Sequence, residues 1–223
     1  MHPFVPLHSP RALHKVLKKI FCPLGISAAD IAAAQNAGEE AVRNYKNALR
    51  KETERILKEI EKNKWTGIIL AGRPYHVDPA VHHGIPDLIN QLGMAVLSED
   101  GIAMISKKEN PPLRVLNQWS WHSRLYKAAD YVTRHPRLEL VELNSFGCGL
   151  DAIVTDQVKE ILSNGHRLFT SLKIDQSLNL GAVRIRLRSL KAAINERIKG
   201  TQETSPAVYP KAPFTKEMKK AFT

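Results

Sequence analysis

Apolar and polar positions along the chain first predict one long helix. Between residues 27 and 64, apolar residues recur at helical spacing: Val42, Tyr45, Leu49, Ile56 and Ile60. Ser27, followed three residues later by Asp30, is typical of a helix start. We therefore expect a long helix over residues 27–64 that ends near Asn63 and packs on the domain that follows it.

The following segment, residues 65–200, alternates between short apolar runs and helical stripes. The runs predict strands at residues 67–71, 95–97, 138–143 and 167–174. Helical patterns near residues 88–92, 113–134, 151–165 and 182–198 separate or follow them. The alternation predicts an α/β fold, a small Rossmann-like or flavodoxin-like parallel sheet of about four strands with helices on both faces.

Two of these helices carry specific expectations. In the 113–134 helix the inward candidates are Leu116, Trp119, Leu125 and Ala129. The next helix is expected to be capped by Asp151, to turn Val154, Val158 and Ile161 inward and to end at Gly165.

Some segments allow two interpretations. Residues 183–188 alternate apolar and basic, which is also typical of a strand, but the helical stripe continues beyond them, so we predict a helix. Pro86 either begins a helix or bends one already begun at Pro79. Residues 1–26 predict an N-terminal arm with a short helix around 11–20, and the proline-rich segment 201–223 predicts a linker toward a further domain.

Composition narrows the class of protein. Two cysteines in 223 residues argue against a disulfide scaffold and favour a reducing compartment. The apolar runs are too short to span a bilayer and the N-terminus lacks a signal-peptide pattern, so we expect a cytoplasmic protein with no membrane partner. The net charge of +11 is scattered and no finger or RNA motif accompanies it, so we favour phosphates of a nucleotide or coenzyme A, or an acidic partner, over nucleic acid.

Candidate chemistry gathers where strands are expected to end, because ligands of α/β proteins bind at the carboxyl ends of strands. The loop after the first strand offers Arg73, Tyr75, His76 and Asp78, with His83 nearby. Arg73 could hold a phosphate or a carboxylate in a bidentate manner. The alternative is that Arg73 pairs with Asp78 or Asp100 and only shapes the loop.

The loop after the third strand places Cys148 between Gly147 and Gly149. A thiol at a strand end and a helix start could be a nucleophile, a redox thiol or a metal ligand. The alternative is a small buried cysteine in a tight turn. Cys22 could act with Cys148, but two thiols do not complete a cubane cluster, which normally takes four protein ligands.

Three other groups have more ordinary interpretations. Trp119, Trp121 and His122 fit core or interface aromatics better than a stacking platform. The neighbouring His82 and His83 lack the spacing of a zinc site. The set Arg184, Arg186 and Arg188 is typical of a solvated face, or of an anion site near the fourth strand end.

Four segments together resemble a known family, the large activator-type proteins related to 2-hydroxyacyl-CoA dehydratases. The segments are residues 70–79 (LAGRPYHVDP, with HGI at 83–85), 144–151 (NSFGCGLD), 173–175 (KID) and 179–191 (NLGAVRIRLRSLK). In this family, ATP-hydrolysing activase domains come first and a region similar to the iron–sulfur dehydratase D-component comes later. The resemblance therefore implies a fragment of a longer protein, with those domains as partners.

The resemblance also implies a function. The chain would be part of an iron–sulfur electron-transfer or dehydratase-like assembly coupled to ATP hydrolysis elsewhere in the parent chain, and would not be catalytic alone. Cys148 matches a ligand position of a 4Fe–4S cluster that is incomplete or absent in this chain. The implied cleft residues are Arg73, Tyr75, His76 and Asp151, oriented by Asp100 and Asn144. The alternative is a non-catalytic binding or scaffold domain for coenzyme A, acyl-CoA, a nucleotide or neighbouring domains.

Overall fold

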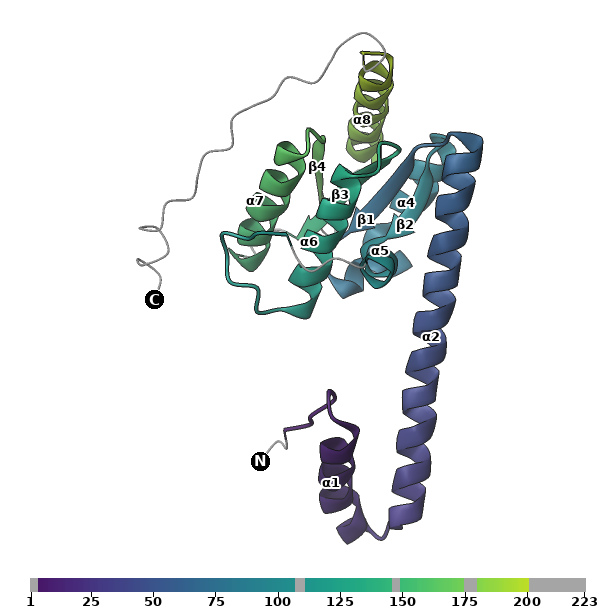
Figure 1. Cartoon of the computed structure of the whole chain (residues 1–223), viewed down its shortest axis with the longest axis vertical. Coiled ribbons are helices and arrows are strands. Elements are labelled where there is room, and N and C mark those ends of the chain that lie inside the picture. The colour runs from purple at the N-terminus through teal and green to yellow at the C-terminus, as the bar shows by residue number, and fades with distance from the viewer. Residues whose placement is uncertain (1–3, 107–110, 146–148, 175–179, 201–223) are drawn as a thin grey trace. The chain divides into compact units, whose positions relative to one another are not determined.

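A computed structural model describes residues 4–106, 111–145, 149–174 and 180–200 (Figure 1). The chain divides into two compact units, Met1–Leu180 and Gly181–Thr223. The first unit holds two N-terminal helices and the sheet domain. The described part of the second unit belongs to helix α8 (Leu180–Gly200).

The N-terminal part consists of α1 (Pro10–Phe21), the 3₁₀ turn η1 (Cys22–Leu24) and the long helix α2 (Ala28–Asn63). The hydroxyl of Ser27 accepts the backbone N–H of Asp30 at 3.1 Å and donates to the Asp30 carboxylate at 2.7 Å. This confirms the predicted helix start, because a capping hydroxyl satisfies one of the unpaired N–H groups of the first turn. The predicted end near Asn63 is confirmed as well.

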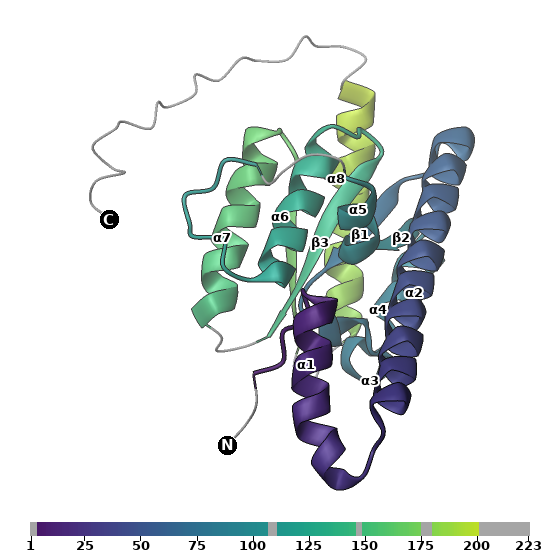
Figure 2. The ribbon, with the colours of Figure 1, turned by 60° about the horizontal axis from the view of Figure 1, so that its bottom comes forward.

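The two halves of α2 have different surroundings. The C-terminal half packs on α5 and β2, where Thr53 and Ile60 are buried, and the N-terminal half runs beside α1 (Figures 1 and 2). Val42 and Tyr45 are 52% and 60% exposed, so the helical spacing of the apolar residues does not bury all of them. Tyr45 still reaches the sheet domain, since its hydroxyl lies 3.5 Å from the Asp100 carboxylate of α5.

The sheet consists of β1 (Gly67–Ala71), β2 (Ala95–Ser98), β3 (Leu138–Ser145) and β4 (Phe169–Ile174). The strand order is β2-β1-β3-β4 and every pair is parallel, as predicted. Ile69 in β1 stands opposite Leu97 in β2 and Leu140 in β3. The chain passes from β1 to β2 on one side and later to β3 on the other side, so the topological switch point lies between β1 and β3.

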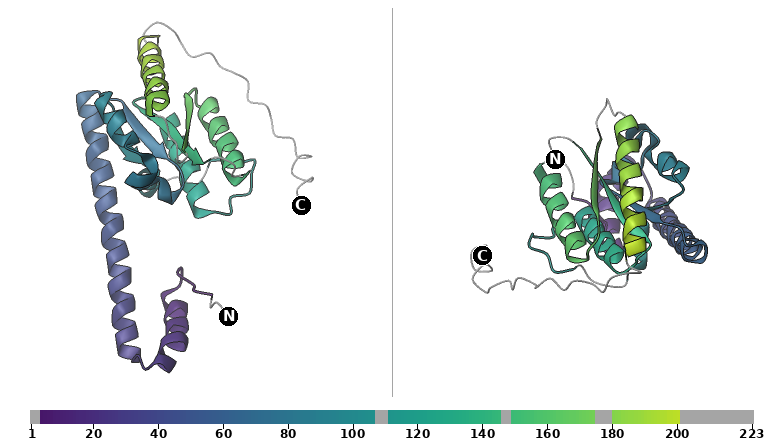
Figure 3. Two further views of the ribbon diagram at one scale, coloured as in Figure 1. Left: turned by 180° about the vertical axis from the view of Figure 1, so that it is seen from behind. Right: turned by 90° about the horizontal axis from the view of Figure 1, so that it is seen from above.

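Helices surround the sheet: α3 (Pro79–His82), α4 (Ile85–Gln91), α5 (Glu99–Ile105), α6 (Ser120–Thr133) and α7 (Gly149–Asn164). Ile69 and Leu140 form a buried core with Ile102, Leu125 and Val158, so α5, α6 and α7 pack on the same face. Helix α4 connects β1 to β2 on the opposite face (Figure 3), as a right-handed crossover requires. The α/β prediction is therefore confirmed.

Several local predictions need correction. The helix predicted over 113–134 begins only at Ser120, and Leu116 and Trp119, expected inside, are exposed. Residues 99–105, for which no helix was predicted, form α5. Asp151 does not cap α7 but lies in its first turn, because the helix already begins at Gly149.

Other local predictions are confirmed. Leu125 and Ala129 of α6 are buried, as are Val154, Val158 and Ile161 of α7. Pro86 stands in the first turn of a separate helix, α4, because His83 and Gly84 adopt positive φ angles of 49° and 82° and end α3. Residues 183–188 lie within α8 and are helical.

None of the described helices is both long enough and apolar enough to cross a membrane.

Candidate functional site

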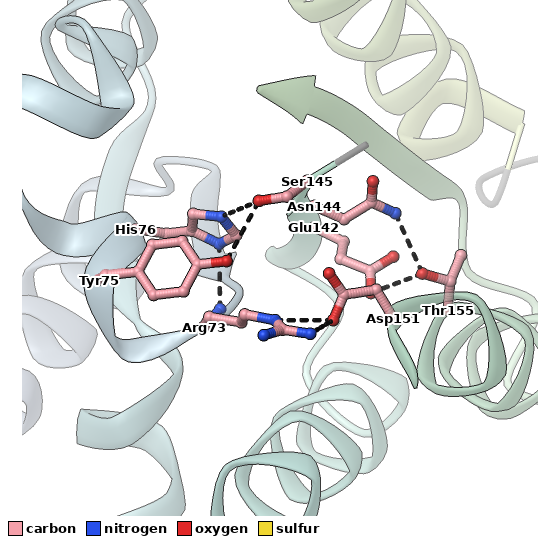
Figure 4. Close-up of polar contacts among 8 residues, drawn as sticks. All are labelled: Arg73, Tyr75, His76, Glu142, Asn144, Ser145, Asp151 and Thr155. Atoms are coloured by element: carbon pink, nitrogen blue, oxygen red, sulfur yellow. Dashed lines mark hydrogen bonds and ion pairs between the residues drawn. The ribbon is translucent and has the colours of Figure 1, made fainter. Parts of the chain in front are cut away.

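Polar side chains from three segments meet at the switch point, where the carboxyl ends of β1 and β3 lie side by side (Figure 4). Arg73 and the 3₁₀ turn η2 (Pro74–Val77) follow β1, Ser145 ends β3, and Asp151 lies in the first turn of α7. Open α/β sheets bind ligands at this place. The sequence predicted that the β1 loop and Asp151 would converge here, and the structure brings them into contact.

Arg73 and Asp151 form the central ion pair of the site. The Arg73 Nε and Nη2 atoms lie 2.9 Å and 2.8 Å from the same oxygen, Asp151 Oδ1. The Arg73 side chain is 25% exposed and that of Asp151 only 6%. The guanidinium also stacks on Trp121, with Cζ 5.1 Å from the ring centroid. Asp151 Oδ2 is buried and has no hydrogen-bond partner among the described residues.

His76 connects β1 to the end of β3. Its Nδ1 accepts the backbone N–H of Arg73 at 3.0 Å, so the proton of the neutral ring is on Nε2. Nε2 lies 3.3 Å from Ser145 Oγ, and the Tyr75 hydroxyl lies 3.2 Å from the same atom. Burial lowers the pKa of His76, while Asp151 raises it and Arg73 lowers it further. His76 is therefore held as a neutral donor toward Ser145.

Gly72 makes this arrangement possible. A Cβ atom there would lie 2.4 Å from His76 Nδ1 and 2.8 Å from the backbone oxygen of Leu143. The close approach of His76 to the end of β1 therefore requires glycine at position 72.

A second set of polar groups lies behind the ion pair, between β3 and α7 (Figure 4). Asn144 Nδ2 donates to Thr155 Oγ1 at 3.2 Å, and Thr155 donates to Glu142 Oε1 at 3.0 Å. Burial raises the pKa of Glu142 to about 7, against a smaller lowering by the Thr155 hydrogen bond. Glu142 Oε2 is buried without a partner among the described residues.

His122 completes this buried group from α6. Its ring lies 3.8 Å from the Trp121 ring, and its Nε2 atom is buried with no hydrogen-bond partner in the described part of the chain. Burial lowers the pKa of His122, with a raising effect from Asp151 and a lowering effect from Arg73. The sequence suggested a core or interface aromatic at position 122 but gave no sign that Arg73 and Asp151 would influence its pKa.

The other candidate residues lie outside this network. Asp78 caps α3 by accepting the backbone N–H of Ala80, and His83 is exposed between α3 and α4. The Asp100 carboxylate accepts the backbone N–H of Gly101 and lies 3.5 Å from the hydroxyl of Tyr45 on α2. Their role as ligand-binding residues stays a prediction.

Gly149 is the first residue of α7, whereas Gly147 and Cys148 fall outside the described residues. Cys22 is an exposed free cysteine. Within the described ranges, no group of three or more His, Cys, Asp or Glu side chains is placed to hold a metal ion. These residues therefore do not fit a 4Fe–4S cluster on their own.

A cavity of about 160 Å³ adjoins the switch point at the ends of β1 and β2. Its walls are mainly aliphatic, and its ionisable lining residues are Arg73, His76, His82 and Glu99. Glu99 was not predicted as a site residue, since it belongs to a helix that the sequence did not reveal. Arg73 and His76 belong to both the cavity and the switch-point network.

Comparison with protein families gives one match. Residues 1–102 match the family described as CoA enzyme activase uncharacterised domain. The matched segment includes α1, α2, β1, β2 and the loop that carries Arg73 and His76. This match supports a relation to CoA enzyme activases. No curated protein and no solved structure matched the chain.

Proposed function

We propose that this chain is the ligand-binding part of an activator-type protein related to 2-hydroxyacyl-CoA dehydratases, and that its switch point receives the polar part of a coenzyme A ester. The activase-domain match over residues 1–102 supports the activator class. The four motifs that include residues 70–79 and 144–151 support the dehydratase relation.

The observation that carries the proposal is the incompletely satisfied polar group at the switch point. Asp151 Oδ2 and His122 Nε2 are both buried without partners among the described residues, and Arg73 and Asp151 act on the pKa of His122. Buried polar atoms of this kind cost free energy unless a water or a ligand satisfies them. Coenzyme A esters carry amide N–H groups, carbonyls and phosphates, so one ligand could satisfy Asp151, His122 and the arginine together.

In this proposal the chain acts within a larger cytoplasmic assembly and is not catalytic alone. ATP hydrolysis and a complete iron–sulfur cluster belong to activase and D-component-like domains that it contacts. The described residues hold and orient the ester: Arg73 meets its anionic or carbonyl groups, and His76 keeps Tyr75 and Ser145 in place.

Calorimetry with coenzyme A and acetyl-CoA tests the ligand. We expect saturable heat that Arg73→Ala weakens at least about tenfold, since a charge-assisted contact contributes about 1.5–3 kcal/mol. Arg137→Ala is the matched control, because the Arg137 side chain has similar exposure but directly precedes β3, at the amino ends of the strands. Saturating coenzyme A esters that give neither heat nor a thermal shift would contradict the proposal.

A second candidate role is participation in an iron–sulfur cluster through Cys148. It is supported by the position of Cys148 in the sequence, between the last residue of β3 and the first residue of α7. Cluster reconstitution without oxygen, in the longer protein or with its partner domains, tests this role. We expect Cys148→Ser to lower iron content and visible absorption while Cys22→Ser does not; unchanged values in Cys148→Ser would exclude Cys148 as a ligand.

A further inference from the structure

The cavity at the carboxyl ends of β1 and β2 has the size of a small organic molecule. Its volume of about 160 Å³ is enclosed in part by Leu70 of β1, Val96 and Leu97 of β2, and Leu143 of β3. An apolar cavity of about 150 Å³ accommodates benzene. The space therefore suits a ligand of about six non-hydrogen atoms with a hydrocarbon part.

His82 is one of the polar residues that line this cavity. It is only 9% exposed, and its Nδ1 atom accepts the backbone N–H of Gly84 at 3.2 Å. In a neutral imidazole that accepts through Nδ1, the proton is on Nε2. Among the described residues no hydrogen-bond partner of Nε2 is observed, and His82 lines the cavity.

Glu99 supplies the second polar group. It is 3% exposed, and its Oε1 atom lies 3.7 Å from Arg124 Nη2, which is longer than a hydrogen bond. Burial raises the pKa of Glu99 to about 7; Asp100 raises it further, and Arg124 and backbone N–H groups lower it. A large fraction of Glu99 is therefore protonated at neutral pH, and a protonated carboxyl can donate.

The remaining polar lining residues favour the same kind of ligand. Arg73 carries a positive charge, and Ser98 has a hydroxyl. The Arg73 guanidinium is paired with Asp151, and the rest of the lining is mainly aliphatic. A ligand complementary to this lining has a carbonyl or carboxylate oxygen at one end and a short aliphatic chain at the other.

We propose that this cavity is a binding site for a short-chain aliphatic carbonyl group, as a free monocarboxylate or as the acyl end of a thioester, with His82 Nε2 and the Glu99 carboxyl as donors to its oxygen. The chain lies against Leu70, Val96 and Leu143. The site borders the switch point but does not require a coenzyme A ester to bind there.

Butyrate and butyrylpantetheine are the probes, because both have the short chain and neither has the nucleotide of coenzyme A. Ligand-observed NMR and the shift of the His82 Nε2 proton report binding to the folded protein. We expect a response at millimolar probe, in line with about 4 kcal/mol of binding energy. Binding of butyrate identifies a free acid as the ligand, and binding of butyrylpantetheine alone identifies an acyl group.

Variants test the two donors. We expect His82→Leu and Glu99→Leu each to weaken probe binding at least fivefold, Glu99→Gln to retain it because an amide still donates, and His8→Leu on the N-terminal arm to have no effect. If neither probe binds the wild-type protein, or if the His82 proton does not shift when a probe binds, the proposal is overturned. If the probes bind but coenzyme A does not, the cavity proposal is supported and only the switch-point proposal is contradicted.

Discussion

Arg73 and Asp151, 78 residues apart in the sequence, join the carboxyl ends of β1 and β3 through two guanidinium nitrogens that contact one carboxylate oxygen. The geometry leaves the other oxygen, Asp151 Oδ2, buried without a partner among the described residues. The ion pair therefore holds the switch point together and leaves an acceptor there that a bound molecule could satisfy.

The first prediction concerns the energetic coupling of this pair. We expect Arg73→Ala to lower the free energy of unfolding by about 1–3 kcal/mol, because it leaves the buried Asp151 carboxylate without a counter-charge. Asp151→Asn should lower the free energy of unfolding by less than Arg73→Ala does. The double variant should lower it by less than the sum of the two single changes, with a coupling energy of about 1–2 kcal/mol. Urea denaturation at pH 7 measures all three values.

The exposed arginine Arg55 provides the control for this cycle. It pairs with Glu52 and Glu59 on α2, and its side chain is 55% exposed. Exposed pairs contribute little, so Arg55→Ala should lower the free energy of unfolding much less than Arg73→Ala does. Purely additive effects of Arg73→Ala and Asp151→Asn would mean that their contact does not stabilise the fold.

The second prediction concerns the ionisation of His76. Because burial lowers its pKa while Asp151 raises it and Arg73 lowers it, Asp151→Asn should lower the pKa further and Arg73→Ala should raise it. The neutral ring stabilises the fold above the unfolded value of 6.5, and this contribution is lost as the pH falls through the folded value. Nitrogen-15 NMR of the imidazole follows the titration and the Nε2–H tautomer; a tautomer with the proton on Nδ1 would contradict the network.

The third prediction concerns the buried carboxyl of Glu142. Burial raises its pKa from 4.5 to about 7, so its contribution to stability is present below pH 4.5 and is lost as the pH rises through about 7. Glu142→Gln retains an acceptor for Thr155 and removes the charge. We expect it to raise the free energy of unfolding by about 2–3 kcal/mol at pH 8 and to have little effect at pH 4.5.

Urea denaturation across this pH range tests the Glu142 prediction. Glu61→Gln serves as the control, since the Glu61 side chain is 63% exposed and lies at the end of α2. An effect of Glu142→Gln that does not grow with pH would show that Glu142 is not desolvated in the folded protein.

The fold followed from the sequence because parallel strands covered on both faces are short continuous apolar runs. Helix α5 escaped detection because it has only seven residues and contains Gly101, which weakens a helical pattern. The helix predicted from residue 113 began too early, because Leu116 and Trp119 have helical spacing but are exposed. Spacing alone does not show whether apolar residues have anything to pack against.

The site was predictable only in part. Arg73, His76 and Asp151 could be grouped from the sequence, since strand ends meet at one edge of a parallel sheet. Glu142 could not, because a carboxylate inside a strand gives no sign of whether it is buried. His122 could not be predicted either, since its burial depends on how α6 packs on the sheet rather than on any local motif.

The last prediction concerns the contact that fixes α2 to the sheet domain. A Cβ atom at Gly101 of α5 would lie 2.3 Å from Thr53 Oγ1, which donates to the Leu49 carbonyl at 2.8 Å within α2. We expect Gly101→Ala to lower the free energy of unfolding by about 1–3 kcal/mol, because the added methyl group overpacks the contact between α2 and α5. In a Thr53→Ala background the clash is removed. Gly101→Ala should then leave the free energy of unfolding unchanged or raise it by up to about 1 kcal/mol through better helix propensity.

Gly38→Ala in α2 is the control, because nothing lies within 4 Å of its added Cβ and the helix should gain stability. If Gly101→Ala costs the same with and without Thr53, then the two helices are not held apart by this single contact, and the packing of α2 on α5 must tolerate a shift.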